Sequence, residues 1–276
     1  MATVAFVIHP DRPEADDAAR DAEQWLTSRG HHILHVTDDP GAQWADNAPG
    51  VDLAVSLGGD GTMLRTVALA AAKGVPVLGV NLGRLGYLTE VEPAGLREAL
   101  ERFLAGDHDV EERMTLEVEL DRAQGERVVY PALNEAVVEK TVPGHTVRVA
   151  TAISGRPFVT YAADGLLVST PTGSTAYNLS ARGPIVSPRL RALVVTPISP
   201  HMLFDRPLVL EPDEPLRLEV VEPRPAVLVI DGQNVAGLEP GDAITCREGP
   251  MPARLVTFGR RDFHAILRAR FGLADR

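Results

Sequence analysis

The most constraining feature of this 276-residue chain is a change of pattern at about residue 107. Before it, short apolar runs alternate with amphipathic stretches, which predicts βαβ units and a parallel sheet. After it, short apolar runs follow one another between Pro and Gly, which predicts a β-sandwich or a related all-β domain. We therefore expect an α/β domain over 1–107 and a β-rich domain over 108–257.

The expected elements can be placed from the apolar spacing. In the first domain they are strands at 4–8, 32–36, 53–57 and 75–81 and helices at 12–29, 63–73 and 96–104. In the second they are strands at 115–120, 147–153, 193–195, 216–221 and 227–230, with one helix starting near Gly173. The tail from Phe263 to Phe271 returns to helical spacing, so we expect about 258–276 to pack back on the first domain and complete it.

Composition argues against several classes of protein. The net charge of -11 and the lack of a basic stretch argue against a nucleic-acid binder. The single cysteine, Cys246, allows no intramolecular disulfide, so we expect a reducing cytoplasm and an inert strand residue. The start lacks the pattern of a signal peptide, and the apolar run Val67 to Ala72 is too short to span a membrane.

A glycine-rich turn, Gly58-Gly59-Asp60-Gly61-Thr62, leads from the third expected strand into a helix. Ligands of open α/β sheets bind at such strand ends, where a helix N-terminus offers free N–H groups. Glycine lets the backbone approach a phosphate closely. An Asp here would repel phosphate unless it binds a metal, caps the helix or removes a proton. The plain structural alternative is that Asp60 is a helix cap.

Two common nucleotide-binding motifs are missing. The only lysines, Lys73 and Lys140, do not follow the glycine frame of a Walker A sequence, and His9-Pro10-Asp11 stands where Rossmann glycines would be. Phosphate binding would then depend on the glycine backbone. A second glycine-rich turn, Asn81 to Leu88, follows a neighbouring strand and should face the same crevice, although a plain loop with two turn glycines is the alternative.

Polar residues also interrupt apolar runs in the second domain. Asp164 to Tyr177 is a short strand followed by hydroxyl residues, which can hydrogen-bond a polar ligand. A Ser/Thr-capped helix would explain only two or three of them.

The adjacent residues Asn134 and Glu135 cannot both face solvent in a strand, because side chains alternate. Glu suits ribose hydroxyls, and Asn suits a base edge or a hydroxyl. Asp231-Gly232-Gln233 ends another apolar run.

Together these segments resemble the NAD kinase family. The matching stretches, in the family's order and spacing, are 58–62, 81–90, 134–135, 164–180, 197–201, 206–208 and 231–233. The turn Gly58 to Thr62 alone is weak evidence, since diacylglycerol and sphingosine kinases and phosphofructokinases share its form. The resemblance implies a phosphofructokinase-like α/β N-terminal domain, an all-β C-terminal sandwich, and a homo-oligomer, dimer or tetramer, with NAD near a subunit interface.

The resemblance also implies a reaction and a site. The γ-phosphoryl group of ATP, with Mg²⁺ or another divalent metal, passes to the 2′-hydroxyl of the adenosine ribose of NAD and gives NADP; inorganic polyphosphate is an alternative donor. Asp60 would be the general base, and no residue is expected to be a dedicated metal ligand. The expected substrate-binding residues are Gly58, Gly59, Gly61, Thr62, Arg65, Asn81, Gly83, Asn134, Glu135, His145, Asp164, Thr172, Thr175, Ala176, Tyr177, Ser180 and Gln233.

Three positions depart from the family: Arg182 replaces a common Gly, His145 a common Arg or Lys, and Tyr87 a usual Phe. Two other functions fit the sequence less well. A lipid kinase needs an apolar acyl pocket and a membrane-active surface, for which the sequence shows no basic or aromatic stretch. A dinucleotide sensor that has lost catalysis should lack the acidic residue, but Asp60 is present.

Overall fold

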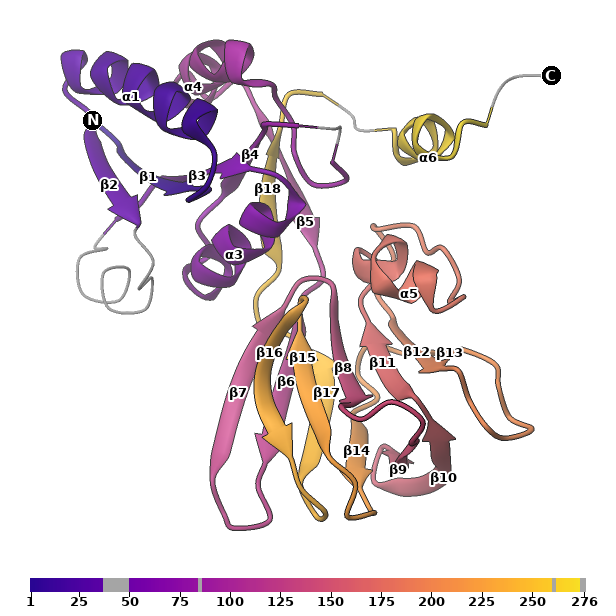
Figure 1. Ribbon diagram of the computed structural model, residues 1–276. Coiled ribbons are helices and arrows are strands. Elements are labelled where there is room, and N and C mark those ends of the chain that lie inside the picture. Colours follow the sequence, from indigo (N-terminus) through magenta and orange to yellow (C-terminus); the bar gives the residue numbers. More distant parts are fainter. Residues whose placement is uncertain (37–49, 84–85, 260–261, 274–276) are drawn as a thin grey trace. The chain divides into compact units, whose positions relative to one another are not determined.

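A computed structural model describes residues 1–36, 50–83, 86–259 and 262–273 (Figure 1). The chain divides into two compact units, residues 1–112 with 252–276 and residues 113–251. These limits differ by a few residues from the expected 107 and 257, because strands β5 (Asp109–Arg113) and β18 (Ala253–Thr257) belong to the sheet of the first unit. No helix in the described part of the chain is long and apolar enough to cross a membrane.

Within the described residues, the first unit contains a six-stranded sheet with the order β2-β1-β3-β4-β18-β5. Its other strands are β1 (Thr3–Ile8), β2 (His32–Val36), β3 (Leu53–Gly58) and β4 (Val77–Asn81). β1 pairs in parallel with β2 and β3, β3 pairs in parallel with β4, and β4 with β18. The predicted parallel sheet is confirmed.

Helices cover both faces of this sheet. The helices α1 (Pro13–Ser28) and α4 (Leu96–Leu104) share one apolar core with the strands, while α3 (Asp60–Ala70) lies on the other face (Figure 1). The 3₁₀ helices η1 (Ala71–Lys73) and η2 (Pro93–Gly95) adjoin α3 and α4. The helix α3 begins three residues earlier than expected, so its first turn includes part of the glycine-rich segment.

The chain returns to the first unit through strand β18, which pairs with β4. The C-terminal helix α6 (Phe263–Phe271) has the predicted bounds, but none of its residues is buried. Trp25 packs in the core beside α4, and Trp44 lies outside the described residues.

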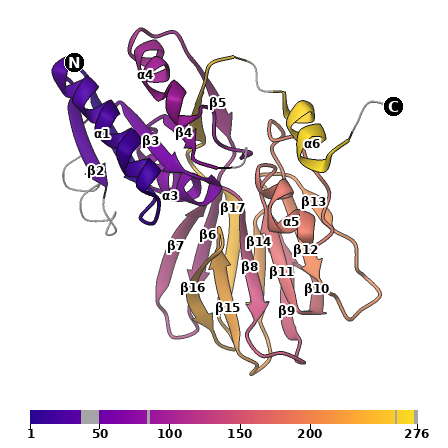
Figure 2. The ribbon, with the colours of Figure 1, turned by 45° about the horizontal axis from the view of Figure 1, so that its top comes forward.

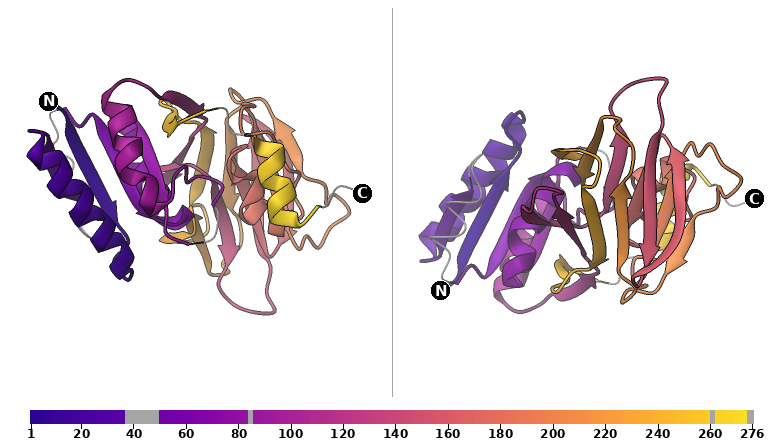
Figure 3. Two further views of the ribbon diagram at one scale, coloured as in Figure 1. Left: turned by 90° about the horizontal axis from the view of Figure 1, so that it is seen from above. Right: turned by 90° about the horizontal axis from the view of Figure 1, so that it is seen from below.

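The second unit is a sandwich of two antiparallel sheets, which Figure 2 shows from an oblique angle and Figure 3 from above and below. The first sheet has the order β10 (Arg156–Ala163), β9 (Val147–Ile153), β14 (Leu216–Val220), β17 (Ala243–Glu248), β6 (Leu116–Asp121), β7 (Arg127–Ala132). The second has the order β13 (Leu208–Leu210), β12 (Leu193–Ile198), β11 (Gly165–Ser169), β8 (Glu135–Lys140), β15 (Ala226–Ile230), β16 (Gln233–Leu238).

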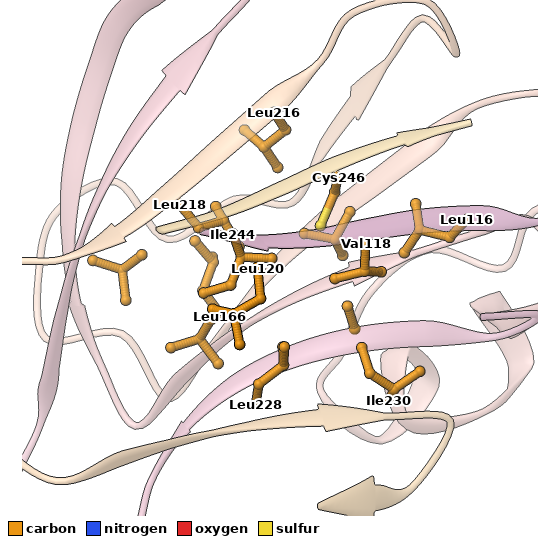
Figure 4. Close-up of a cluster of buried hydrophobic side chains, with 14 of the residues drawn as sticks. Leu116, Val118, Leu120, Leu166, Leu216, Leu218, Leu228, Ile230, Ile244 and Cys246 are labelled. Carbon is orange, nitrogen blue, oxygen red and sulfur yellow. The ribbon is translucent and has the colours of Figure 1, made fainter. Parts of the chain in front are cut away.

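Alternate side chains of both sheets meet in one apolar core (Figure 4). Leu116, Leu166 and Leu228, which come from three different strands, are all fully buried in it. Cys246 lies in the same core, and burial raises the pKa of its thiol to about 12. A thiol held neutral and away from solvent fits the inert role expected for it.

Candidate functional site

Asp60 is the first residue of α3 and follows Gly59 at the end of β3. Its Oδ2 accepts a hydrogen bond from the backbone N–H of Tyr87 at 3.2 Å, and its Oδ1 accepts one from Leu88 at 3.3 Å. The two glycine-rich turns therefore meet, as expected from their positions on the neighbouring strands β3 and β4. The helix has no side-chain cap, so Asp60 does not act as the helix cap that was considered as an alternative.

The glycines of these turns serve two different purposes. A Cβ atom at Gly58 would lie 2.2 Å from Thr62 Oγ1, and one at Gly86 would lie 2.3 Å from Asp60 Oδ1. Gly58 therefore permits close packing within the first turn, and Gly86 permits close packing between the two turns. Nothing in the described structure lies within 4 Å of a Cβ atom placed at Gly59 or Gly61. Those positions leave room for a ligand to reach the backbone at the helix N-terminus.

Arg65 and Asn81 form hydrogen bonds at the ends of β1 and β4, the two strands on either side of β3. Arg65 Nη2 donates to the carbonyl oxygen of Ile8 at 2.8 Å, at the end of β1. The Asn81 side chain accepts from the Gly83 N–H at 3.2 Å and donates to the Gly83 carbonyl at 3.0 Å, which shapes the second turn. Arg12, which the sequence analysis did not single out, donates to the carbonyl of Leu82 in the same turn.

In the second unit, Asn134 and Glu135 lie at the corner where the chain passes from β7 in one sheet to β8 in the other. Both are buried, with exposed fractions of 9% and 5%. The Asp231 carboxylate accepts the backbone N–H groups of Leu133 and Asn134 at 2.8 Å and of Glu135 at 3.0 Å. Asp231 therefore fixes the corner that presents Asn134 and Glu135.

Asp231 is a supporting residue that the sequence analysis missed, since only Gln233 was assigned from that segment. Asp231 and Gly232 both have positive φ, 46° and 80°, and they join β15 to β16 in a two-residue turn. Asp-Gly between two alternating strands is a strong signal for such a hairpin, and it could have identified the turn. Gln233 itself is exposed and begins β16.

Glu135 is the most electrostatically perturbed carboxylate of this corner. Burial, and then the negative charge of Asp231, raises the pKa of Glu135 to about 8, although a hydrogen bond from the backbone N–H of Tyr177 opposes this. Burial also raises the pKa of Asp231. Glu135 Oε2 and Thr172 Oγ1 are buried and have no hydrogen-bond partner among the described residues. Such atoms are rare in folded proteins, so they indicate where ligand hydroxyl groups can bind.

Some of the hydroxyl residues that end or follow β11 form hydrogen bonds that hold the backbone together, and others do not. Ser169, Thr170 and Ser174 donate to the backbone carbonyls of Thr170, Leu133 and Pro171 at 2.6–2.7 Å, so they build the fold. The expected helix is the 3₁₀ turn η3 (Gly173–Thr175) followed by the short helix α5 (Tyr177–Ser180). Thr175 makes only a long 3.4 Å bond to the Thr172 carbonyl, Ala176 is half-buried, and Ser180 is exposed.

Tyr177 connects the two ends of strand β8. Its N–H bonds to Glu135 at the start of the strand, and its hydroxyl lies 3.3 Å from Glu139 Oε1 near the end. At that far end Lys140 Nζ donates to Asp164 Oδ1 at 2.6 Å. His145 follows in an exposed loop. The structure thus brings Asn134, Glu135, Thr172 and Tyr177 together and places Asp164 and His145 beyond the other end of β8.

Among the described residues, no group of three or more His, Cys, Asp or Glu side chains is placed to hold a metal ion. Two histidines at or near β2 contact other groups of the protein. His31 Nδ1 accepts the Ala2 N–H at 3.1 Å, and His35 Nε2 lies 2.7 Å from Glu23 Oε1. Glu23 comes from the neighbouring helix α1.

Known proteins are similar to this chain over nearly its whole length. Residues 43–108 match the ATP-NAD kinase N-terminal domain, and residues 133–258 match the ATP-NAD kinase C-terminal domain. The chain is 47% identical to the NAD kinase of Heliobacterium modesticaldum, over 97% of this chain and 98% of that protein. It is 37% identical to the NAD kinase of Geotalea daltonii over the full length of both. This chain belongs to the NAD kinase family.

Solved structures of NAD kinases have the same fold. The yeast NADH kinase complexed with NADH matches with a TM-score of 0.89 at 26% identity, over 100% of this chain and 89% of that one. The NAD kinase from Archaeoglobus fulgidus in complex with ATP matches with a TM-score of 0.72 at 25% identity, over 98% and 97%. The predicted family, the α/β plus all-β fold and NAD kinase activity are confirmed, and the lipid-kinase and sensor alternatives lose their support.

Proposed function

We propose that this NAD kinase transfers the γ-phosphoryl group of ATP to the 2′-hydroxyl of the adenosine ribose of NAD, with Asp60 as the general base. The observation that carries this role is the setting of the Asp60 carboxylate, half-buried at the N-terminus of α3 beside the open space over Gly59 and Gly61. Each oxygen accepts one backbone N–H. An ionised carboxylate has about four acceptor sites, so sites remain for a hydroxyl group.

In this mechanism Asp60 takes the proton of the 2′-hydroxyl as its oxygen forms a bond to the γ-phosphorus. The bond from that phosphorus to the β–γ bridging oxygen breaks, so ADP leaves and NADP forms. The free N–H groups of the turn and the N-terminus of α3 offset the negative charge of the phosphates. A positioned base typically contributes about 10²–10⁴-fold to such a reaction, and alignment of the two substrates supplies further acceleration.

The NAD subsite in this proposal is the corner at Glu135. Glu135 Oε2 and Thr172 Oγ1, which lack partners, would form hydrogen bonds with ribose hydroxyls, while Asn134 would contact the adenosine. Tyr177, Asp164 and His145 follow the length of strand β8 and would contact the rest of the dinucleotide. Thr175, Ala176, Ser180 and Gln233 are the further contacts expected from the family resemblance.

Three finer features belong to the same proposal. Mg²⁺ would enter with ATP and be held largely by phosphate oxygens, where it would neutralise the charge that develops during transfer. ATP is the proposed donor, with inorganic polyphosphate as a second donor to be tested. A cytoplasmic location is supported by the single, buried cysteine, which suits a reducing compartment.

We also propose that the chain forms a homo-oligomer through the second unit. Phe158 and Val209 lie on the edge strands β10 and β13 and are 46% and 59% exposed, and Leu203 between β12 and β13 is fully exposed. Apolar residues at sheet edges favour association with another chain. Leu203→Asp should shift the mass measured by light scattering towards the monomer, and an unchanged mass would contradict this interface.

A donor-by-acceptor assay tests the reaction itself. ATP or polyphosphate is offered with NAD or NADH, and the position of the new phosphate is read by phosphorus NMR. We expect a 2′-phosphate on the adenosine ribose in the reaction of ATP with NAD. A phosphate at any other position would contradict the proposed chemistry.

A further inference from the structure

The C-terminal helix α6 carries Arg270 to the Asp60 turn. Arg270 Nη2 lies 3.8 Å from Asp60 Oδ2, and its guanidinium carbon lies 4.7 Å from the centre of the Tyr87 ring. The N–H of Tyr87 donates to the same Oδ2. The guanidinium is therefore held against both groups that define the position of the proposed base, at a point where Arg270 and Asp60 are each about a third exposed.

The position of α6 is not explained by packing. None of its residues is buried, so it contributes little to the apolar core. The helix nevertheless has defined ends. The Asp262 side chain accepts the N–H groups of His264 and Ala265, and Gly272 ends the helix with a φ of 59°. A well-capped helix without a buried side chain, but with a cation beside the proposed base, points to a role in the reaction.

The phosphates need a cation at this place. A triphosphate brings about three to four negative charges next to the Asp60 carboxylate, and like charges at close range repel each other. Two other arginines near the turn, Arg12 and Arg65, donate to the backbone carbonyls of Leu82 and Ile8. At 3.8 Å the contact of Arg270 with Asp60 is an ion pair without a hydrogen bond, so its N–H donors can turn to phosphate oxygens.

We propose that Arg270 is a further catalytic residue, whose guanidinium moves from Asp60 to the transferred phosphoryl group during the reaction. This inference rests on the proposed role of Asp60 as the base. While Asp60 takes the hydroxyl proton and the phosphoryl group passes from ADP to the 2′-oxygen, the guanidinium stays protonated and donates to the phosphoryl oxygens. Its planar set of donors suits this contact, and arginines with this role contribute about 10³–10⁵-fold in other phosphoryl-transfer enzymes.

The test compares Arg270→Ala, Arg270→Lys and a control on the same helix, His264→Ala, whose side chain is highly exposed. We expect Arg270→Ala to lower kcat by about 10²-fold or more while the KM for NAD stays within a few-fold. Arg270→Lys should recover part of the rate, and millimolar guanidinium added to Arg270→Ala should do the same. His264→Ala should keep kcat within about twofold.

Two results would overturn the inference. One is a kcat of Arg270→Ala within twofold of an active wild type, which would leave NAD kinase activity intact and remove only the role of Arg270. The other is a loss of rate that neither lysine nor guanidinium restores and that accompanies a lower melting temperature, which would indicate a structural role. A wild type that does not phosphorylate NAD would instead contradict the proposed function as well.

Discussion

The glycine-rich turn of the first unit and the Glu135 corner of the second each present a carboxylate, but the two carboxylates have different surroundings. Both oxygens of Asp60 accept backbone N–H groups, and open space adjoins it over Gly59 and Gly61. Glu135 is buried, has one oxygen without a partner, and has a pKa raised to about 8. The first site has the room and partial positive charge that the proposed phosphate binding needs, and the second has buried polar atoms that suit the proposed contacts with hydroxyl groups.

The largest effect on stability should come from the residue that supports the Glu135 corner. Asp231→Ala removes the acceptor of three backbone N–H groups and should lower the free energy of unfolding by at least about 3 kcal/mol. It should also raise the KM for NAD about tenfold, because Asn134 and Glu135 lose their fixed backbone. Chemical denaturation and steady-state kinetics measure the two effects.

Asp242→Ala is the matched control for that variant. Asp242 is buried in the same unit, accepts the N–H groups of Ala123 and Glu239, and pairs with Arg122 at 2.8 Å. It should lose similar stability without a change in the KM for NAD. An equal rise of KM in both variants would show that Asp231 acts only through general stability.

A substitution in the open space of the glycine-rich turn should lower activity without lowering stability. Gly61→Ala adds a methyl group where nothing lies within 4 Å, in a helix that prefers Ala to Gly by up to about 1 kcal/mol. Stability should therefore hold or rise, while kcat/KM for ATP falls about 10- to 100-fold because the phosphates lose their approach. Gly95→Ala, at the start of α4, is the control for stability without loss of activity. Unchanged kinetics in Gly61→Ala would contradict phosphate binding at this backbone.

Glu135→Gln tests how burial affects the carboxylate of the second unit. The folded protein keeps a proton on Glu135 that the unfolded chain releases above about pH 4.5, since the pKa is raised to about 8. Between these values the folded state binds more protons, so the contribution of Glu135 to stability falls as pH rises. The melting temperature of Glu135→Gln should exceed that of the wild type more at pH 8 than at pH 5.

Although Glu135→Gln should raise the melting temperature, it should weaken the binding of NAD. Gln keeps the shape of Glu but puts an NH₂ group, which can only donate, in place of one carboxyl oxygen, so a ribose hydroxyl loses an acceptor and the affinity for NAD should fall about tenfold, as measured by calorimetry. A pH-independent gap in melting temperature would contradict the raised pKa, and unchanged affinity would remove Glu135 from the NAD subsite.

The smallest effect concerns backbone strain after α5. Arg182 has a φ of 65°, a conformation that costs an L-residue about 1–2 kcal/mol, which explains why Gly is common at this place in the family. Arg182→Gly should raise the free energy of unfolding by about 0.5–1 kcal/mol, after the extra freedom of Gly in the unfolded chain is allowed for. Arg182→Ala keeps the Cβ atom and should bring no gain; equal gains in both would contradict the strain.

Much of the fold could be predicted because periodicity and turn residues are local signals. The bounds of β2, β9, α4 and α6 match the prediction to the residue, and the change of pattern near 107 lies a few residues before the boundary between the two units. The membership of β5 and β18 in the sheet of the first unit could not be predicted, because strand pairing across more than a hundred residues leaves no local trace.

The glycine-rich turn could also be predicted, because its proposed function depends on space beside the backbone, and glycine residues mark such positions in a sequence. The Glu135 corner could be predicted only in part. The sequence shows two polar residues in an apolar run, but not that Asp231, about a hundred residues away, fixes them. Nor does any local pattern identify Arg270, whose meaning comes only from its distance to Asp60.

In the proposed mechanism Asp60 performs the chemistry, and Glu135 and its neighbours bind NAD. Steady-state kinetics of Asp60→Asn with NAD as the varied substrate tests it most directly. Asn keeps the size of the side chain and can still accept from one of the N–H groups of Tyr87 and Leu88, but it cannot take a proton at neutral pH. We predict a kcat lower by about 10²–10⁴-fold with a KM for NAD within a few-fold of the wild type. A near-normal kcat would contradict the account.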